Sequence, residues 1–182
     1  MPSEVLLLQS GWAKVSATTL AGRPVLLALR GPGDLVGELS ALDDEPRSAS
    51  IEAIEPVRAL AMTHDRFRAL LAERPDTALA LMRELSARLR DADAKRIQMA
   101  TFTTVERVAL CLLELCERFG EEQDGAVDIA LALSQEELAS WAGASLESVG
   151  RALQQMRGLG WIETRRRAIR VLDPAALRRA TG

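Results

Sequence analysis

A stretch near the C-terminus decides the fold: residues 134–151 read SQEELASWAGASLESVGR. Ser134 and Glu137 form a capping-box pattern, which predicts the start of a helix of about two turns. Gly143 lies where the chain must turn sharply, often with positive φ, and Ser145 can cap the next helix. A short helix, a tight glycine turn and a second capped helix together predict a helix–turn–helix.

The apolar residues of this stretch fit two crossing helices. Ala139 is small, as a close helix crossing requires, and Leu138, Val149 and Leu153 supply apolar faces that hold the helices together. An ordinary corner in a helical domain would share these features. The motif alone therefore leaves that alternative open.

Arginines accumulate around the motif. Residues 134–182 contain eight arginines and five acidic residues, a net charge of +3, whereas the whole chain carries −3. Residues 160–173, GWIETRRRAIRVLD, predict a two-stranded wing whose turn is Arg165, Arg166 and Arg167. Basic side chains on the second helix and on the wing favour a surface that contacts phosphates of double-stranded DNA.

The exposed first turns of the second helix should enter the major groove of DNA. Leu146, Glu147 and Arg151 lie there. Arg151 can donate two hydrogen bonds to a guanine edge, and Glu147 can accept one from cytosine N4. Ser145 and Ser148 suit phosphate contacts.

The N-terminal part of the chain predicts strands rather than helices. Turn residues recur between residues 5 and 62, for example in Gly31-Pro32-Gly33-Asp34. Residues 48–62, SASIEAIEPVRALAM, alternate apolar and polar side chains, as half-buried strands do. We expect a compact antiparallel β unit here, and hence an α+β fold for the whole chain.

Two helices should follow the β unit. Thr63 can cap a short helix that ends before Pro75, and Pro75 fits the first turn of a helix continuing to Met99. The apolar positions of this long helix are near the 3.5-residue spacing of a two-helix seam: Ala78, Met82, Leu85, Leu89 and Ala92. The helix can pack on its own domain, but it is longer than a small β unit can cover. A partner helix, and so a homodimer, is the better prediction.

The next capping box is Thr103-Thr104-Val105-Glu106, which opens a helix to Phe119 that ends at Gly120. Residues 100–103 therefore form a hinge, and residues 121–125, EEQDG, a polar loop. We expect three parts: a β-roll (1–74), a dimerisation helix with the hinge (75–102) and a winged helix–turn–helix (103–182).

Other classes of protein are disfavoured. Cys111 and Cys116 lie in an apolar run and are interpreted as core thiols, and the single histidine, His64, is remote, so we expect no metal site and no disulfide. The catalytic motifs of enzymes are not apparent. The N-terminus does not resemble a signal peptide, and apolar runs fall short of the ~20 residues of a membrane span. We expect a cytoplasmic protein without a membrane partner.

From Glu4 to Leu172 the chain resembles the cyclic-AMP receptor protein and fumarate–nitrate regulator (CRP/FNR) family of transcription regulators. One motif is the helix–turn–helix, where Glu147 and Arg151 match the family's base-contacting residues. The other is Gly37-Glu38-Leu39 followed by Arg47-Ser48-Ala49, which resembles the family's phosphate-binding cassette. The resemblance implies an effector such as cyclic AMP, and RNA polymerase as a further partner.

The cassette also makes chemical sense. Arg47 can pair with a phosphate, Ser48 can donate to it, and Glu38 can accept from a ribose hydroxyl. The alternatives are a surface ion pair of Arg47 with one of the acidic residues 43–45, and a solvated turn residue at Glu38. Two hypotheses therefore stand: control by a cyclic nucleotide, or a regulator without small-molecule input whose β-roll is a scaffold or a protein-docking surface.

The chain departs from the family in several places. Ala92 and Asp93 replace the Thr-Ser pair that contacts adenine in the members that bind cyclic AMP, and Leu146 replaces a base-contacting arginine. We therefore expect an unusual operator. The chain also begins late, so we expect a β-roll without its first strands, with sheet edges unpaired or core partly exposed. The N-terminal cysteine cluster of oxygen-sensing members is missing, which disfavours an iron–sulfur sensor.

Overall fold

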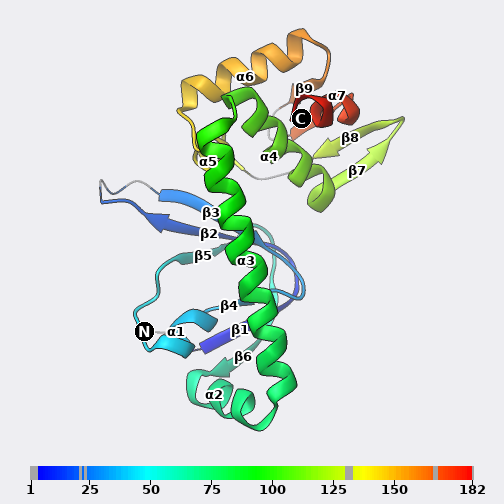
Figure 1. Cartoon of the computed structure of the whole chain (residues 1–182). Helices are drawn as coiled ribbons and strands as arrows, with labels where there is room; N and C mark the ends of the chain where they lie inside the picture. Colours follow the sequence, from blue (N-terminus) through cyan, green and yellow to red (C-terminus); the bar gives the residue numbers. More distant parts are fainter. Residues whose placement is uncertain (1–3, 21, 23, 130–132, 166–167, 182) are drawn as a thin grey trace. The chain divides into compact units, whose positions relative to one another are not determined.

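The structure is a computed structural model of the chain (Figure 1), and it describes residues 4–20, 22, 24–129, 133–165 and 168–181. The chain forms two compact units, Met1–Ala94 and Lys95–Gly182. The α+β class predicted from the sequence is confirmed, because a β-rich N-terminal unit precedes a mixed C-terminal unit. None of the helices described is long and apolar enough to cross a membrane.

The first unit is built on two antiparallel three-stranded sheets, ordered β4-β1-β6 and β3-β2-β5. Their strands are β1 (Glu4–Ser10), β2 (Ala13–Thr18), β3 (Pro24–Arg30), β4 (Leu35–Val36), β5 (Ser50–Ala53) and β6 (Arg58–Thr63). The predicted turn before β4 is present: the N–H of Gly31 donates to the Asp34 carboxylate at 2.8 Å, and Gly33 has φ 91°. The turn thereby directs the chain toward the start of helix α1 (Glu38–Asp43).

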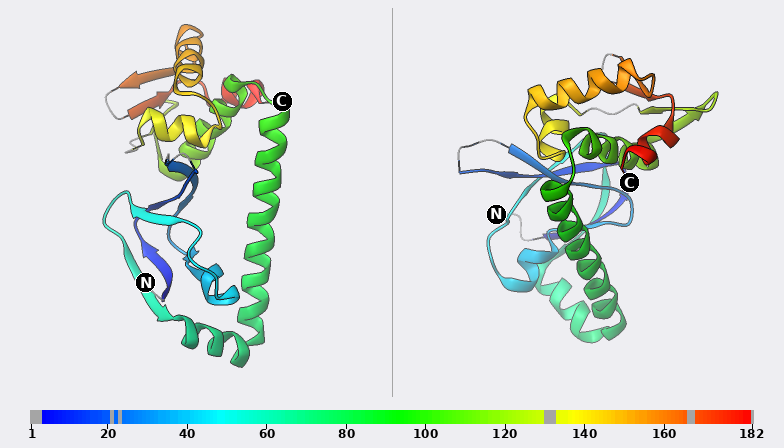
Figure 2. Two further views of the ribbon diagram at one scale, coloured as in Figure 1. Left: turned by 90° about the vertical axis from the view of Figure 1, so that its left-hand side faces the viewer. Right: turned by 45° about the horizontal axis from the view of Figure 1, so that its top comes forward.

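Helices close the core of this unit. α2 (His64–Glu73) begins at its predicted cap, Thr63, and α3 (Pro75–Thr101) follows at once (Figure 2). Val5, Ala41, Phe67 and Leu81 form one buried cluster, in which β1, α1, α2 and α3 meet. β5 and most of β6 are exposed, so the half-buried alternation expected for residues 48–62 is wrong, and apolar side chains lie at these sheet edges.

The second unit starts with the last turns of α3, and its described residues form four further helices and one sheet. The helices are α4 (Thr104–Phe119), α5 (Gln135–Trp141), α6 (Leu146–Gly158) and α7 (Pro174–Ala180). The strands are β7 (Gly120–Gln123), β8 (Ala126–Ile129), β9 (Ile162–Arg165) and β10 (Ala168–Val171), in the order β7-β8-β10-β9. The core lies between α4, α6 and α7, with Val108, Leu112, Val149, Met156 and Leu177 almost fully buried.

One expectation for this unit is wrong. Residues 121–125 are not a simple polar loop, because β7 and β8 pair as a hairpin from Gly120↔Ile129 to Gln123↔Ala126. Asp124 and Gly125 both have positive φ, 53° and 75°, as the tight turn of a two-residue hairpin requires. β8 also pairs with β10, so the wing is part of a four-stranded sheet.

Candidate functional site

The first helix of the motif begins as its sequence predicts. The Ser134 hydroxyl accepts from the N–H of Glu137 at 3.1 Å, and the Glu137 carboxylate accepts from the N–H of Ser134 at 2.8 Å. This reciprocal capping box satisfies two backbone donors that the helix itself leaves unpaired. It fixes the start of α5.

The turn between α5 and α6 depends on Gly143. Its φ is 60°, and a Cβ there would lie 2.9 Å from the Cε of Met99. The left-handed backbone favours glycine, whereas the methionine methyl lies at the end of a flexible side chain that can shift. The N–H of Ala144 then donates to the carbonyl of Ala139 at 2.9 Å, which closes the turn.

α6 has one buried and one exposed face. The Ser145 hydroxyl caps it by accepting from the N–H of Ser148 at 3.1 Å. Its buried residues, which pack on α4 and α5, are Val149, Ala152, Leu153 and Met156. Leu146, Glu147 and Arg151 are exposed on the first turns, where the sequence predicted them.

The polar side chains of this face are linked to each other. Arg151 forms an ion pair with Glu147 and donates to the Ser148 hydroxyl at 3.2 Å, and that hydroxyl lies 2.9 Å from the Ser145 hydroxyl. The Arg151 side chain is 64% exposed. Exposed ion pairs contribute about 1 kcal/mol or less to stability. A base edge or a phosphate can therefore replace Glu147 as the partner of Arg151.

The two wing arginines that the structure describes differ in exposure. Arg165 is exposed and lies 3.3 Å from Glu163, whereas Arg170 is held in the sheet by Asp128 at 3.5 Å. Arg166 and Arg167 lie outside the described residues.

In the first unit, Gly37 and Arg47 of the cassette come together. Gly37 precedes α1 with φ 83°, and a Cβ there would overlap a guanidinium nitrogen of Arg47. Arg47 also donates to the carbonyl of Glu4. The guanidinium is therefore held beside the first residues of α1. Leu39 and Ser48 are exposed.

Glu38 is buried, at 4% exposure, which corrects the alternative of a solvated turn residue. Its carboxylate accepts from Arg88 of α3 at 2.7 Å, and Arg88 also donates to the carbonyl of Leu35 at 3.0 Å and to Glu84 at 2.9 Å. A buried carboxylate needs such a partner. The sequence analysis missed Arg88, because its spacing from Glu84 is that of an ordinary surface pair on one helix.

Both halves of the chain match models of known families. Residues 1–74 match the cyclic nucleotide-binding domain, and residues 106–180 match the Crp-like helix-turn-helix domain. A CRP-like cAMP-activated global transcriptional regulator of Mycobacterium tuberculosis is 37% identical over 93% of this chain and 76% of that protein. The chain belongs to the CRP/FNR family.

Other members agree with this assignment. A cyclic AMP receptor protein of Thermus thermophilus is 34% identical over 90% of this chain and 76% of that protein. A CRP/FNR-family transcriptional regulator, also from Thermus thermophilus, has a solved structure with a TM-score of 0.84, at 25% identity, over 99% of this chain and 88% of that one. The chain is therefore a DNA-binding transcription regulator, not an enzyme.

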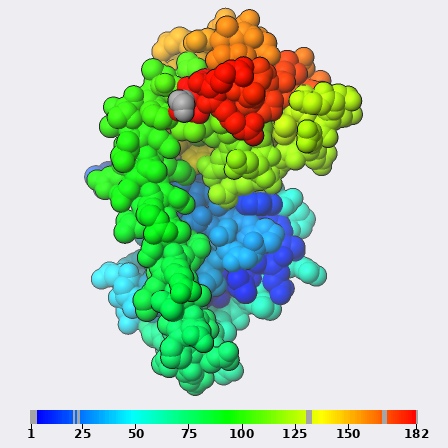
Figure 3. Space-filling model, turned by 45° about the vertical axis from the view of Figure 1, so that its right-hand side comes forward, coloured from blue at the N-terminus to red at the C-terminus, as the bar shows by residue number. Residues whose placement is uncertain are grey.

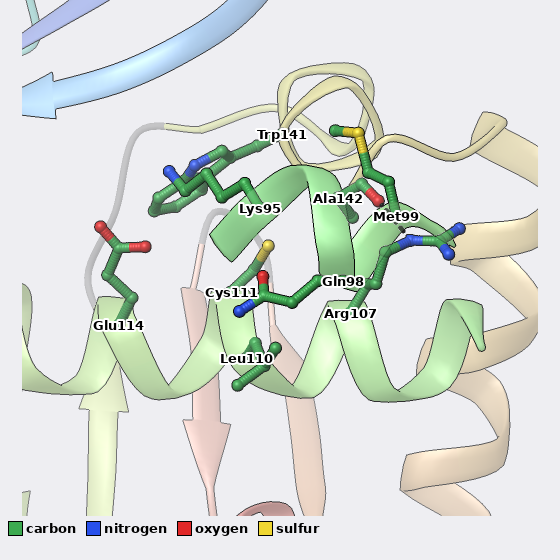
Figure 4. A pocket seen from close by; sticks show the side chains of 9 residues that line it. All are labelled: Lys95, Gln98, Met99, Arg107, Leu110, Cys111, Glu114, Trp141 and Ala142. Atoms are coloured by element: carbon green, nitrogen blue, oxygen red, sulfur yellow. Dashed lines mark hydrogen bonds between the residues drawn. The ribbon is translucent and has the colours of Figure 1, made fainter. Parts of the chain in front are cut away.

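In this CRP/FNR-family chain, Arg107 of α4 is a second residue that the sequence analysis missed (Figure 4). Its Nε donates to the carbonyl of Ala142 at 2.8 Å, and its Nη1 donates to the carbonyl of Phe102 at 2.6 Å. Arg107 thus joins the end of α3 to the turn of the helix–turn–helix. The sequence offers no signal for this link, because Ala142 is far from the other two residues along the chain.

A small cavity of about 40 Å³ lies beside Arg107, lined by residues of α3, α4 and α5. That space holds only a few water molecules, so it is not a ligand site. Lys95 lies over the ring of Trp141, 5.5 Å from its centre, at the wall of the cavity.

Cys111 is buried in the core, as the sequence predicts, whereas Cys116 is only half-buried. Burial raises the pKa of the Cys111 thiol to about 12 and that of Cys116 to about 11. Both thiols are therefore protonated at neutral pH and poor nucleophiles.

Proposed function

We propose that the chain acts as a homodimer that reads an inverted-repeat operator through α6, under the control of a cyclic nucleotide bound in the first unit. The observation that carries the DNA-reading part is the exposed polar group on the first turns of α6. Arg151 suits a guanine edge, Glu147 suits cytosine N4, and Ser145 and Ser148 suit phosphates. The wing residues Arg165, Arg166 and Arg167 would add phosphate contacts.

Replacing Arg151 with alanine tests this reading. We expect the Arg151→Ala protein to lose about 1–3 kcal/mol of discrimination at one base pair of each half-site, because a bidentate contact to guanine is removed. The measurement is binding to every single-base variant of the operator recovered from randomised DNA. Arg157→Ala, at the far end of the same helix, should keep the sequence preference. An unchanged preference in Arg151→Ala would remove this role.

The dimer is supported by the exposed apolar residues of α3. Of the residues in the predicted seam, Met82, Leu89 and Ala92 are exposed, and so is the neighbouring Leu79, whereas Ala78 is half-buried. The face of α3 shown in Figure 3 is uncovered. Leu85, which we expected in the same seam, instead packs partly against the core of its own unit. A second α3 helix would cover the remaining stripe.

The effector proposal rests on Glu38 and Arg47. A cyclic nucleotide would place its phosphate beside Arg47 and Ser48 and its ribose hydroxyl at the Glu38 carboxylate. Ala92 and Asp93 lack the hydroxyl groups expected for contacts to adenine. We therefore expect the base to contribute less to the binding free energy of the nucleotide than the phosphate and the sugar.

A thermal-shift titration with cyclic AMP and cyclic GMP tests the effector. A nucleotide at a hundredfold excess over its Kd should stabilise the native protein by about 2.7 kcal/mol, which raises Tm by roughly 5–10 °C. Arg47→Ala should abolish that rise, whereas Arg66→Ala, at an exposed arginine of α2, should keep it. If millimolar nucleotide leaves the Tm of the wild-type protein unchanged, the first unit is a scaffold or a docking surface instead.

A regulator of this kind acts where the chromosome is, so we propose the bacterial cytoplasm as its location. RNA polymerase stays a predicted partner, without an assigned surface.

A further inference from the structure

Leu146 is an unusual residue for its position. It is the first residue of α6 and is 45% exposed, although its neighbours Ser145, Glu147 and Ser148 are all polar. The structure buries the other large apolar side chains of α6, which are Val149, Leu153 and Met156. Leu146 therefore lies, only partly covered by protein, on the part of the helix that should face DNA.

Gly150 lies one turn after Leu146 on the same side of the helix. Glycine destabilises a helix interior relative to alanine, so its presence needs a reason. A Cβ at position 150 would meet no atom within 4 Å, and its φ is not left-handed. Gly143 differs, because its positive φ explains it. The described atoms outside its own helix turn therefore give no reason for a glycine at position 150.

These two residues lie beside the polar stripe. At 3.6 residues per turn, Leu146 and Gly150 are on one side of the Glu147 and Arg151 pair, and Ser148 is on the other. The exposed face of α6 therefore presents a shallow apolar strip, formed by Leu146 and Gly150, beside the hydrogen-bonding side chains of Glu147 and Arg151. An apolar side chain adjacent to a glycine leaves room for a small apolar group to approach the helix backbone.

We propose that Leu146 and Gly150 read the 5-methyl group of a thymine in the major groove. The edges of the four bases there carry donors and acceptors, and the thymine methyl is their apolar group. Leucine cannot form a hydrogen bond, so it discriminates by covering that methyl group, and Gly150 lets the helix come close enough. This inference rests on the proposed function of α6 as the helix that reads the operator.

Deoxyuridine tests the proposal, because it is thymidine without the methyl group. In the operator recovered from randomised DNA, each thymine is replaced in turn by uracil, and the affinity of the full-length protein is measured. One position in each half-site should lose about fourfold in affinity, as expected for one buried methyl group. Leu146→Ala should bind the thymine and uracil operators equally, whereas Leu159→Ala, at the exposed leucine beyond the end of α6, should keep the difference.

Glycine variants supply an independent readout. Gly150→Ala should raise the Tm of the protein but weaken operator binding. Gly158→Ala, at the last residue of α6, where glycine is common and a Cβ also meets nothing within 4 Å, should raise the Tm and leave binding unchanged.

The outcomes separate this inference from the proposed function. If uracil is tolerated at every position while Arg151→Ala still relaxes specificity, the thymine contact is wrong and DNA reading by α6 stands. If Leu146→Ala keeps the preference for thymine over uracil, another residue reads the methyl group. If the protein selects no sequence at all, the proposed function fails as well.

Discussion

Replacing Arg88 with leucine is expected to lower the free energy of unfolding by about 3 kcal/mol, because it leaves the Glu38 carboxylate buried without its cation. Glu38 is 4% exposed, and Arg88 is its partner at 2.7 Å. Leucine fills part of the space of the arginine but offers no hydrogen bond. Urea unfolding of the purified protein measures the loss.

Two further variants make this expectation specific. Arg83→Leu, on an exposed position of the same helix, should change the free energy of unfolding little. Adding Glu38→Gln to Arg88→Leu should recover part of the loss, because a neutral amide is easier to bury than a carboxylate. Equal losses in Arg83→Leu and Arg88→Leu would show that the ion pair does not stabilise the first unit.

Replacing Leu89 with lysine is expected to have the largest effect on DNA binding. The Leu89 side chain is 64% exposed in the single chain and lies in the stripe that we assign to the dimer seam. A charge there opposes helix pairing, and loss of the dimer removes the second half-site contact. Linking two DNA-binding units in one dimer commonly raises the affinity by a factor of roughly 10²–10⁴. The affinity for the inverted repeat should therefore fall by at least about a hundredfold when the dimer is lost.

Size-exclusion chromatography with light scattering measures the first part of this effect, and fluorescence anisotropy with operator DNA measures the second. Arg90→Ala, at the adjacent exposed position, should remain dimeric and bind normally. A Leu89→Lys protein that is still dimeric at micromolar concentration would place the dimer interface elsewhere.

The helix–turn–helix could be predicted in detail because its signals are local. Ser134 with Glu137, and Ser145 with Ser148, pair within one turn of helix, and the structure has these hydrogen bonds. Gly143 takes the positive φ that its place in the motif requires. Capping and turn conformation depend on neighbours in the sequence, so the sequence specifies them directly.

Two local elements were missed although signals existed. Asp124-Gly125 is a strong hairpin signal, but the acidic residues around it hide the strand pattern, since all of β7 is exposed. Asp173-Pro174 is a cap followed by proline at the first helical position, and it opens α7. Both are short elements, and periodicity is hard to recognise over so few residues.

The remaining misses are long-range contacts. Arg88 reaches Glu38 across fifty positions of the sequence, and Arg107 reaches Ala142 across thirty-five. Spacing along the chain carries no information on such partners. The buried ion pair that holds Glu38 could therefore not be predicted, and the role of the cassette residues stays a prediction.

Selection of binding sites from randomised DNA, with and without cyclic AMP, tests the central claim most directly. The account predicts an enriched inverted repeat whose half-site centres are about 10 base pairs apart, or a multiple of that, because two α6 helices of a symmetric dimer enter successive major grooves. Enrichment of a single unrepeated site, or of no sequence under either condition, would contradict it.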